Sequence, residues 1–589
     1  MQLTGSLFAN MSAIYGNGLS TFPDYPAEIR APHGTVSGVS GFQVHIGSTK
    51  VNTPGDFCDL LVAMNPAALK ANAKWCKPTA MILVDDDAFN EAGMKKAGFK
   101  TENPFEELKV EDRTIIVAPI TTLTQESLKD SGMDNKAILK CKNMFTLGMA
   151  CYIYNRPLEY IYTYLENKFA KKHPEVIEPN KKVLNDGYNY AANIQAIANT
   201  YTCEPVKAQK PGLYRNITGN QAVAWGLLAA SEKSGLPLFC GSYPITPATG
   251  ILEELAIHKS LGCKTLQAED EIAGICTAIG ASFAGDLAVT TTSGPGLSLK
   301  SEALGLAVMT ELPLVVVDVQ RGGPSTGLPT KTEQSDLDQA LYGRNGECPL
   351  VVMAAHSPAN CFDAAFNAAK IALEHMTPVI LLSEGFLGNG SEPWRIPSMA
   401  DYPAIKPPFV KGVLAEGERF EPFKRDPETF VRRWAIPGQK GFEHRVGGLE
   451  KNHSGVLSSD PANHELMVRE RAEKVARVAR DIPALEVDGP ASGNLLVVGW
   501  GGTYGHIKSA VDEIGGVSYA HFDYINPLPA NTGEVFAAFK KILVCELNSG
   551  QFADYLRARF PEFEFIKCNK VQGQPFLVNE LTEAIKKEM

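Results

Sequence analysis

The chain has 589 residues, of which 44% are hydrophobic and 21% charged, and its formal net charge is -10. This composition is typical of a globular protein with several domains. The negative charge argues against nucleic acid or an anionic membrane as the main partner. No apolar run approaches the roughly 20 residues that span a bilayer, and the N-terminal stretch lacks the basic region and continuous apolar segment of a signal peptide. We therefore expect a cytoplasmic protein.

The twelve cysteines are scattered along the chain, and no two lie within four residues of each other. This spacing excludes the local Cys-x-x-Cys signatures of zinc and iron–sulfur sites. We predict reduced thiols in apolar surroundings. The sequence shows no other cluster with metal-ligand spacing, so it assigns no metal ligand to this chain, and none of the eleven histidines is singled out.

Residues 1–202 show an α/β pattern with largely buried strands. Short apolar runs at 59–64, 80–85 and 114–119 alternate with polar or helical stretches. Helices around 142–154 and 158–172 close the segment. Residues 203–215 then have the proline, lysine and glycine content of a linker.

Residues 216–395 give the clearest pattern, in which strands alternate with helices. Such alternation predicts a parallel, doubly wound sheet. The predicted helices are 221–235, 247–262 and 359–376, and the predicted strands are 236–243, 287–294, 313–320, 349–357 and 378–387.

Residues 396–490 are predicted as a long irregular excursion that ends in a charged helix around 464–482. The last segment, 491–589, is a second small α/β domain. Its predicted strands are 494–500, 518–525 and 541–548, followed by further helices. The fold class is therefore α/β, multidomain, with doubly wound parallel sheets.

The stretch YPITP, residues 243–247, lies where a predicted strand passes into a helix. Pro244 ends the strand, and Thr246 with Pro247 has the pattern of an N-cap followed by proline at the first helical position. Ligands bind at such carboxyl edges of open sheets, and a helix N-terminus favours anions. A plain capped turn explains the same residues equally well.

The acidic run of Glu269, Asp270 and Glu271 opens the next predicted helix. Acidic side chains are favoured there by the helix dipole, so a solvated first turn is one interpretation. The other is a carboxylate held beside a titrating ring, where it tunes a proton transfer.

Two segments rich in glycine, serine and threonine, 290–296 and 318–336, also follow strands. Small residues let the backbone approach a ligand closely. Arg321 stands alone at the end of an apolar strand, a position suited to a bidentate contact with a carboxylate. A surface arginine at a strand end is the alternative.

The stretch GWGGTYG, residues 499–505, follows another strand and suggests a dinucleotide-binding turn. Its spacing is wrong, because G-x-G-x-x-G requires a glycine at position 504, which is Tyr504. Trp500 is also bulky for a phosphate-binding turn. We therefore predict no nicotinamide or flavin binding here, and an NAD-dependent dehydrogenase is only a minor alternative.

The motifs at 243–247, 269–273, 290–296 and 320–330 together resemble the α subunit of the 2-oxoacid:ferredoxin oxidoreductases, which are thiamine-diphosphate, iron–sulfur enzymes. The resemblance is strongest to the 2-oxoglutarate type with a fused γ domain. It covers nearly the whole chain. The γ-like domain is 1–202, and its similar stretches are 25–34 and 54–69. The pyrimidine-binding-type domain is 216–395, and the stretch 444–455 after it is also similar to the family. The transketolase C-terminal-like domain is 491–589, and its similar stretch is CELNSGQFADYLR at 545–557.

The resemblance implies roles for individual residues. Glu271 is similar to the glutamate that contacts the cofactor's aminopyrimidine and promotes removal of its C2 proton, with Glu269 as the fallback. Thr246 is similar to the threonine beside the bound oxoacid, and Arg321 to the arginine that binds its carboxylate. The implied cofactor-binding residues are Tyr243, Pro244, Ile245, Thr246, Glu271, Ser293 and Gly294, and the implied substrate-binding residues are Thr246, Arg321, Ser325 and Thr326.

The resemblance also implies partners. The chain has no Gly-Asp-Gly motif and no cysteine set for a cluster, so Mg²⁺ and the [4Fe–4S] cluster are expected on a separate β subunit, in an α2β2 assembly. The chain would then supply half of the thiamine diphosphate site. The first strand and glycine-rich turn with which γ domains of this family begin are expected to be missing.

The implied reaction converts 2-oxoglutarate and coenzyme A into succinyl-CoA and CO2 while reducing ferredoxin, and it is reversible. Pyruvate or another 2-oxoacid is the alternative substrate, and a non-catalytic scaffold is the alternative from another class. A distal carboxylate needs a second cation, for which Lys331 and Arg344 are candidates.

Overall fold

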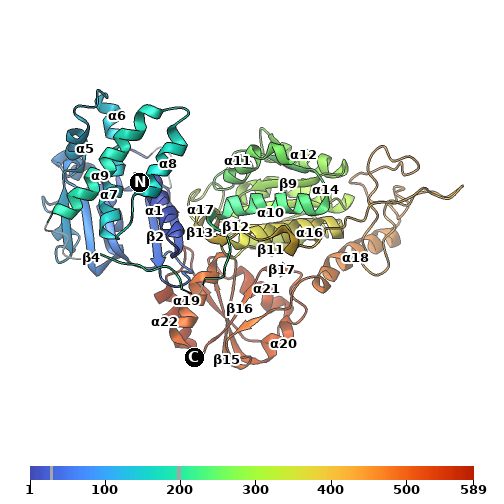
Figure 1. The fold of residues 1–589 in the computed structure, drawn as a ribbon. Helices are drawn as coiled ribbons and strands as arrows, with labels where there is room; N and C mark the ends of the chain where they lie inside the picture. The colour runs from blue at the N-terminus through green and yellow to red at the C-terminus, as the bar shows by residue number, and fades with distance from the viewer. Residues whose placement is uncertain (27–30, 195–199, 208) are drawn as a thin grey trace. The chain divides into compact units, whose positions relative to one another are not determined.

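A computed structural model describes residues 1–26, 31–194, 200–207 and 209–589. The motif at 25–34 therefore lies partly outside the described residues. The chain forms two compact units, one of Met1–Asn216 with Glu392–Arg395 and the other of Ile217–Ser391 with Ile396–Met589 (Figure 1). None of the helices within the described ranges combines the length and hydropathy of a bilayer-spanning segment.

The first unit contains the three strands that the apolar runs predicted. They are β3 (Cys58–Ala63), β4 (Cys76–Asp85) and β5 (Thr114–Ala118), and they form a parallel sheet in that order. Strands β1 (Gly18–Asp24) and β2 (Gly41–Gly47) pair separately and antiparallel, after helix α1 (Gln2–Ile14).

Helices α7 (Lys142–Ile153), α8 (Glu159–Phe169) and α9 (Ile177–Asn193) confirm the helical end of this unit. Helices α7 and α9 cross closely because glycine lies at both contact points. A Cβ atom at Gly148 would lie 2.1 Å from the carbonyl oxygen of Leu184, and one at Gly187 would lie 2.1 Å from that of Phe145. Any larger residue would therefore push the two helices apart.

The second unit contains a seven-stranded sheet in the order β17-β11-β12-β10-β9-β7-β8, in which only β17 runs antiparallel to its neighbour. Its strands are β7 (Leu238–Ser242), β8 (Lys264–Gln267), β9 (Leu287–Thr292), β10 (Leu314–Gln320), β11 (Val351–Ala354), β12 (Pro378–Glu384) and β17 (Tyr524–Asn526). Helices α10 (Gly219–Ser234) and α16 (Asn360–His375) cover one face, and α12 (Glu271–Phe283) and α14 (Ser301–Thr310) cover the other. The predicted doubly wound architecture is confirmed.

A five-stranded sheet follows in the same unit, in the order β14-β16-β15-β18-β19, and only β14 is antiparallel. Its strands are β14 (Val487–Asp488), β15 (Gly493–Trp500), β16 (Ser518–Phe522), β18 (Phe539–Glu546) and β19 (Phe565–Asn569). Helices α19 (Tyr504–Ile514) and α22 (Val578–Glu588) pack on one face, and the core on the other face continues into that of the larger sheet.

One strand prediction was wrong in an informative way. The run 518–525 is not one strand: β16 ends at Phe522, and the chain passes through Asp523 into β17, which joins the larger sheet beside β11. The large side chains of both halves, such as Tyr519, Phe522 and Ile525, are buried, but each half lies in a different sheet.

Residues 396–460 are irregular as predicted, and helix α18 (Pro461–Arg477) follows. It starts three residues before the predicted helix, because the Asp460 side chain caps it by accepting from the backbone N–H groups of Ala462 and Asn463 and proline occupies the first position.

Candidate functional site

The motifs predicted from the sequence meet at the carboxyl edge of the seven-stranded sheet. Strand β7 ends immediately before Tyr243, β9 ends before Ser293, and β10 ends before Arg321. These three strands are neighbours in the parallel sheet, so their following loops lie together. This edge is where open α/β sheets bind ligands.

The turn at Thr246 differs from the prediction. Helix α11 (Thr249–Ile257) starts at Thr249, its N-cap residue is Ala248, and the Thr246–Pro247 peptide bond is cis. The hydroxyl of Thr249 accepts from the Ile245 N–H at 2.7 Å and fixes the turn. The capping role assigned to Thr246 was therefore wrong. Its side chain is exposed, and its carbonyl oxygen accepts from Arg321 Nη1 at 2.8 Å.

Three side chains converge on Gly296, in helix α13 (Gly294–Leu299). A Cβ atom there would lie 2.1 Å from Tyr243 Oη, 2.3 Å from Thr292 Oγ1 and 2.9 Å from Glu271 Cγ. Tyr243 and Thr292 are buried and their hydroxyl oxygens are 3.2 Å apart. Only glycine allows this convergence, so the TTTSGPG motif shapes a cradle between strand ends.

The three acidic residues Glu269, Asp270 and Glu271 lie in different environments. The Asp270 side chain caps helix α12 by accepting from the Ala273 N–H at 2.8 Å, Glu269 is exposed, and Glu271 is half-buried as the first residue of the helix. The structure therefore places Glu271, and not Glu269, beside the Tyr243 hydroxyl and Gly296.

Lys300 lies beneath this cradle and was not anticipated from the sequence. Its side chain is fully buried, its Nζ donates to the Glu271 carbonyl oxygen at 2.6 Å, and the same atom lies 5.0 Å from the centre of the Tyr243 ring. Burial lowers the pKa of Lys300 to about 8. This buried cation fixes the start of helix α12 and raises the positive potential beneath the Glu271 side chain.

Arg321 is 5% exposed and points along the loop edge toward Thr246. Burial lowers the pKa of its guanidinium, and nearby Tyr243, Asp336 and Asp318 counteract part of this effect. Its Nε has no hydrogen-bond partner among the described residues. A buried guanidinium with an unused donor is suited to bind a carboxylate.

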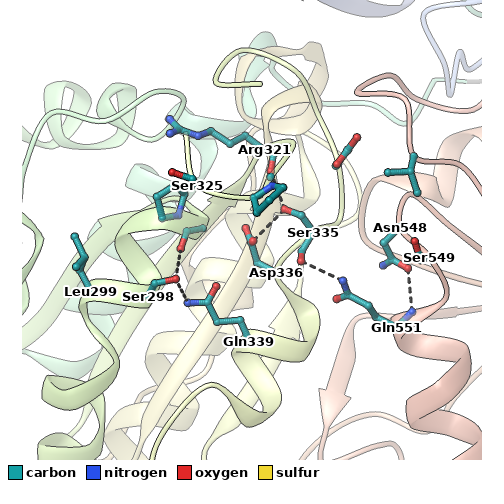
Figure 2. Close-up of a pocket in the computed structure, with 16 residues that line it drawn as sticks. Ser298, Leu299, Arg321, Ser325, Ser335, Asp336, Gln339, Asn548, Ser549 and Gln551 are labelled. Atoms are coloured by element: carbon teal, nitrogen blue, oxygen red, sulfur yellow. Dashed lines mark hydrogen bonds between the residues drawn. The ribbon is translucent and has the colours of Figure 1, made fainter. Parts of the chain in front are cut away.

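A cavity of about 610 Å³ opens beside Arg321, between the seven-stranded sheet and the C-terminal domain (Figure 2). Gly294, Arg321 and Ser325 line it, as do polar residues that the sequence did not single out. Those residues are Ser298, Glu333, Ser335, Asp336, Gln339, Asn548, Ser549 and Gln551. The C-terminal domain reaches the cavity through the loop after β18, which Gln551 holds by donating to the Ser335 carbonyl oxygen at 3.2 Å.

A pair of buried carboxyl groups supports this wall. Asp318 is fully buried on β10, and Asp336 is 7% exposed beside it. Burial, together with the neighbouring Asp336 carboxylate, raises the pKa of Asp318 well above its usual range, and burial raises that of Asp336 to about 6. A carboxyl pair placed beside Arg321 provides a proton-holding group at the cavity.

Of the remaining predicted substrate-binding residues and candidate cations, only Ser325 lines the cavity. Ser325 lines the cavity with a positive φ of 56°, whereas Thr326 is exposed in the same loop and is not part of the cavity wall. Arg344 donates to the carbonyl oxygens of Gln339, Ala340, Leu341 and Cys348, so it holds the end of helix α15 (Leu337–Tyr342). Lys331 also lies outside the cavity lining.

The GWGGTYG stretch packs against the larger sheet. A Cβ atom at Gly501 would lie 2.7 Å from Gln334 Nε2, and one at Gly502 would lie 1.9 Å from Glu384 Oε1. Gln334 also donates to the Trp500 carbonyl oxygen at 2.7 Å. These glycines therefore accommodate side chains of the neighbouring domain, which gives them a packing role.

Three of the cavity residues that sequence reasoning missed share one available signal. Asn548, Ser549 and Gln551 directly follow strand β18, at the carboxyl end of a parallel sheet. The rule that located Arg321 and Ser293 applies equally to this strand. The sequence does not show that the seven-stranded sheet and the five-stranded sheet both contribute residues to one cavity.

The fold and the cavity define the class of protein: an α/β protein whose ligand site lies at the carboxyl edge of a parallel sheet and is closed by a second α/β domain. Comparison with known proteins identifies the family. Residues 232–457 match the family described as pyruvate flavodoxin/ferredoxin oxidoreductase, thiamine diphosphate-binding, and residues 1–190 match pyruvate ferredoxin/flavodoxin oxidoreductase.

The chain is 50% identical to the 2-oxoglutarate oxidoreductase subunit KorA of Mycobacterium tuberculosis, over 100% of this chain and 89% of that protein. It is 35% identical to the 2-oxoglutarate synthase subunit KorA of Methanothermobacter marburgensis, over 63% of this chain and 97% of that protein. The structure of the 2-oxoglutarate:ferredoxin oxidoreductase from Magnetococcus marinus, with 2-oxoglutarate, coenzyme A and succinyl-CoA bound, matches 100% of this chain and 96% of that chain, with a TM-score of 0.85 and 31% identity. The chain belongs to the α subunits of the 2-oxoacid:ferredoxin oxidoreductases, as its motifs predicted.

Proposed function

We propose that this chain is the α subunit of a thiamine-diphosphate-dependent 2-oxoglutarate:ferredoxin oxidoreductase. The reaction joins 2-oxoglutarate to coenzyme A, releases CO2 and passes two electrons singly to ferredoxin, giving succinyl-CoA; it is reversible. The observation that carries the proposal is the buried Arg321 beside a polar cavity of about 610 Å³, in a chain that is 50% identical to a 2-oxoglutarate oxidoreductase subunit over its whole length.

The cradle around Gly296 fits the pyrimidine side of thiamine diphosphate. The Ser293 hydroxyl beside it is fully buried and has no hydrogen-bond partner among the described residues. Glu271 presents a half-buried carboxylate next to the Tyr243 hydroxyl. When bound, thiamine diphosphate supplies the nucleophilic carbon and the electron sink that decarboxylation of a 2-oxoacid needs.

The residues of this chain then perform distinct tasks. Glu271 would hold a proton at the aminopyrimidine nitrogen, and Tyr243, Pro244, Ile245, Ser293 and Gly294 would hold the ring. Arg321 binds the carboxylate next to the oxo group, and its bond to the Thr246 carbonyl oxygen keeps the guanidinium at the cavity edge. Ser325 lines the cavity on the substrate side, and we propose that the exposed Thr326 of the same loop also contacts the substrate.

The chain supplies half of the site, and a β subunit supplies the rest. The rim around Glu271 carries exposed apolar side chains: Leu266 is 40%, Ile272 50% and Leu299 54% exposed. Such a rim beside a buried polar cradle fits a protein partner. We propose that this partner carries the Mg²⁺ that holds the diphosphate and the [4Fe–4S] cluster, and that two αβ pairs form the α2β2 enzyme that meets ferredoxin.

We propose Lys331, which lies outside the cavity lining, in preference to Arg344 as the second cation for 2-oxoglutarate. The guanidinium of Arg344 is committed to four carbonyl oxygens at the end of helix α15. Lys331 lies in the same loop as Ser325, close to Gly573. Lys331→Met should raise the KM for 2-oxoglutarate more than that for pyruvate, whereas Arg344→Met should reduce stability without changing this ratio.

The test is to co-express the chain with its β subunit and measure reduction of ferredoxin or methyl viologen with 2-oxoglutarate, pyruvate and branched-chain oxoacids. We expect the highest kcat/KM with 2-oxoglutarate; a higher value with pyruvate would select the alternative substrate. Glu271→Gln should abolish most turnover, and if turnover were unaffected the non-catalytic scaffold would be favoured.

Cofactor binding has a test that does not depend on turnover. Gly296→Ala puts a methyl group where Tyr243, Thr292 and Glu271 converge, so these side chains must shift, and calorimetric titration of the αβ complex with thiamine diphosphate and Mg²⁺ should show at least a tenfold weaker Kd. Gly305→Ala is the matched control, because a Cβ atom at Gly305 meets no atom within 4 Å. Equal affinities of the two variants would show that the cradle does not receive the cofactor.

A further inference from the structure

Two histidines and an aspartate come together at the point where the two sheets of the second unit meet. His356 follows strand β11 by two residues, His521 lies on β16, and Asp523 is the residue at which the chain passes from β16 to β17. The three are brought together by sheet pairing: β17 pairs with β11, and the Ala354 N–H donates to the Asp523 carbonyl oxygen at 2.8 Å.

The three side chains place one donor atom each around a common point. Asp523 Oδ1 is 2.8 Å from His356 Nδ1 and 3.8 Å from His521 Nε2, and the three donor atoms all lie within 4.8 Å of one another. Tetrahedral zinc, with bonds of about 2.0–2.2 Å to nitrogen and oxygen, requires donors roughly 3.4 Å apart. Zinc would replace the hydrogen bond between His356 Nδ1 and Asp523 Oδ1 and draw the three donor atoms to that spacing.

The surroundings of His521 favour a metal ligand. Its Nδ1 lies 2.6 Å from the Tyr519 hydroxyl, which orients the ring and directs Nε2 toward Asp523. That Nε2 atom is buried and has no hydrogen-bond partner among the described residues. A buried ring nitrogen without a partner, aimed at a carboxylate, leaves a position that a cation would satisfy.

Aromatic rings enclose the same point. The Tyr504 ring lies 4.4 Å from the His356 ring and 5.1 Å from the His521 ring, measured between centroids. The two imidazole rings are 5.4 Å apart and inclined by 79°, so their nitrogen atoms approach a shared centre from different directions. This enclosure limits water on one side of the cluster, while Asp523 remains 36% exposed on the other.

We propose that His356, His521 and Asp523 bind one Zn²⁺ ion, with the fourth position open to water on the exposed side. Two imidazoles and one carboxylate are a donor set that zinc accepts with three protein ligands. The ion ties the end of β11 to the β16–β17 passage, and thus fastens the C-terminal domain to the edge of the larger sheet. This proposal is independent of the function proposed above.

The experiment uses the αβ complex, stripped with a chelator and dialysed, and titrates it with zinc sulfate alone. Bound zinc is counted by mass spectrometry and affinity is measured by calorimetry. We expect the wild type to bind one more zinc per chain than Asp523→Asn or His521→Ala. Tyr519→Phe, which keeps all three ligands, should weaken binding about tenfold.

His464→Ala is the matched control, since this histidine is 64% exposed and pairs with Glu450 at 2.8 Å away from the cluster. It should retain the full zinc content. His521 is buried, so circular dichroism must first show that its variant folds; Asp523→Asn is the same size as the native residue and serves if it does not. Zinc should also raise the Tm of the wild type but not that of Asp523→Asn. Equal zinc content and affinity in the wild type and Asp523→Asn would overturn the proposal.

Discussion

Two buried carboxyl groups in the second unit behave in opposite ways. Glu311, at the end of helix α14, is 1% exposed and accepts from Lys474 Nζ at 2.6 Å and from the Arg425 guanidinium. Although burial opposes ionisation, Lys474, Arg425 and Arg432 hold the pKa of Glu311 at about 2. This carboxylate stays ionised and ties the irregular segment 396–460 and helix α18 to the sheet.

Glu384, at the end of β12, is buried to the same degree. Burial raises its pKa to about 8, and the Thr332 hydroxyl offsets only part of that effect. Glu384 packs against Gly502. The comparison shows that burial alone does not decide the state of a carboxyl group: three cations stabilise the charge at Glu311, whereas at Glu384 the effect of burial dominates and raises the pKa.

The largest expected effect is the loss of activity when Arg321, at the carboxyl edge of the seven-stranded sheet, is replaced. Arg321→Ala removes the guanidinium that we assign to the substrate carboxylate, so kcat/KM for 2-oxoglutarate should fall by roughly 100- to 1,000-fold. Steady-state ferredoxin reduction by the αβ complex measures this. Arg321→Lys keeps the positive charge but cannot make the two parallel hydrogen bonds of a guanidinium to a carboxylate, so it should retain only part of the activity. A loss of less than threefold in Arg321→Ala would remove Arg321 from the site.

Neutralising Glu311 should reduce the stability of the protein more than neutralising Glu384. Glu311→Gln removes the carboxylate that Lys474 and one side of the Arg425 guanidinium contact, although Arg425 keeps its pair with Glu470, so the free energy of unfolding should fall by about 3–5 kcal/mol. Chemical denaturation measures it. Glu473→Gln is the control, because Glu473 is 48% exposed in a pair with Arg477 and its loss should cost less than about 0.5 kcal/mol. Similar losses in the two variants would contradict the role of the cluster.

The contributions of Glu311 and Glu384 to the free energy of unfolding should depend on pH in opposite ways. The pKa of Glu311 is depressed, so its stabilisation is complete above about pH 4.5 and is lost as the pH falls toward 2. The pKa of Glu384 is raised, so its penalty is absent below about pH 4.5 and grows until the pH passes 8. Glu384→Gln should therefore be more stable than the wild type by about 1–3 kcal/mol at pH 8.5 and equal to it near pH 4.5. A variant less stable at both pH values would show that the carboxyl group makes a favourable contact.

The smallest effect is expected at Asp336. Its pKa is raised to about 6, chiefly by burial, so the group gains negative charge beside Arg321 between pH 5 and 7. Asp336→Asn should change kcat/KM by less than about tenfold and remove an inflection near pH 6 from its pH profile. Ser549→Ala, in the opposite cavity wall, should leave that inflection in place. An unchanged profile in Asp336→Asn would assign the inflection elsewhere.

Periodicity and turn signals predicted the sheets well, because buried parallel strands are continuous apolar runs bounded by loops. The strands at 59–64, 80–85 and 313–320 illustrate this. The prediction failed at 518–525 because buried large side chains continue across both halves, and nothing local shows that the chain changes sheets at Asp523.

The candidate site was predicted only in part. Thr246, Glu271 and Arg321 follow strand ends, so local signals located them. The capping role predicted for Thr246 was wrong, because the helix starts three residues later and its N-cap residue is Ala248. Lys300 and the zinc cluster were beyond reach. Lys300 lies within a helical run, and His356 and His521 are joined only by pairing between distant strands.

The central claim is that the carboxyl edge of the seven-stranded sheet forms half of a site for 2-oxoglutarate. The most direct test is the kcat/KM of the αβ complex for 2-oxoglutarate and pyruvate, with ferredoxin as acceptor, in the wild type and in Glu271→Gln. We predict at least a tenfold preference for 2-oxoglutarate and a loss of at least 100-fold in the variant. A preference for pyruvate, or a Glu271→Gln enzyme as active as the wild type, would contradict the account.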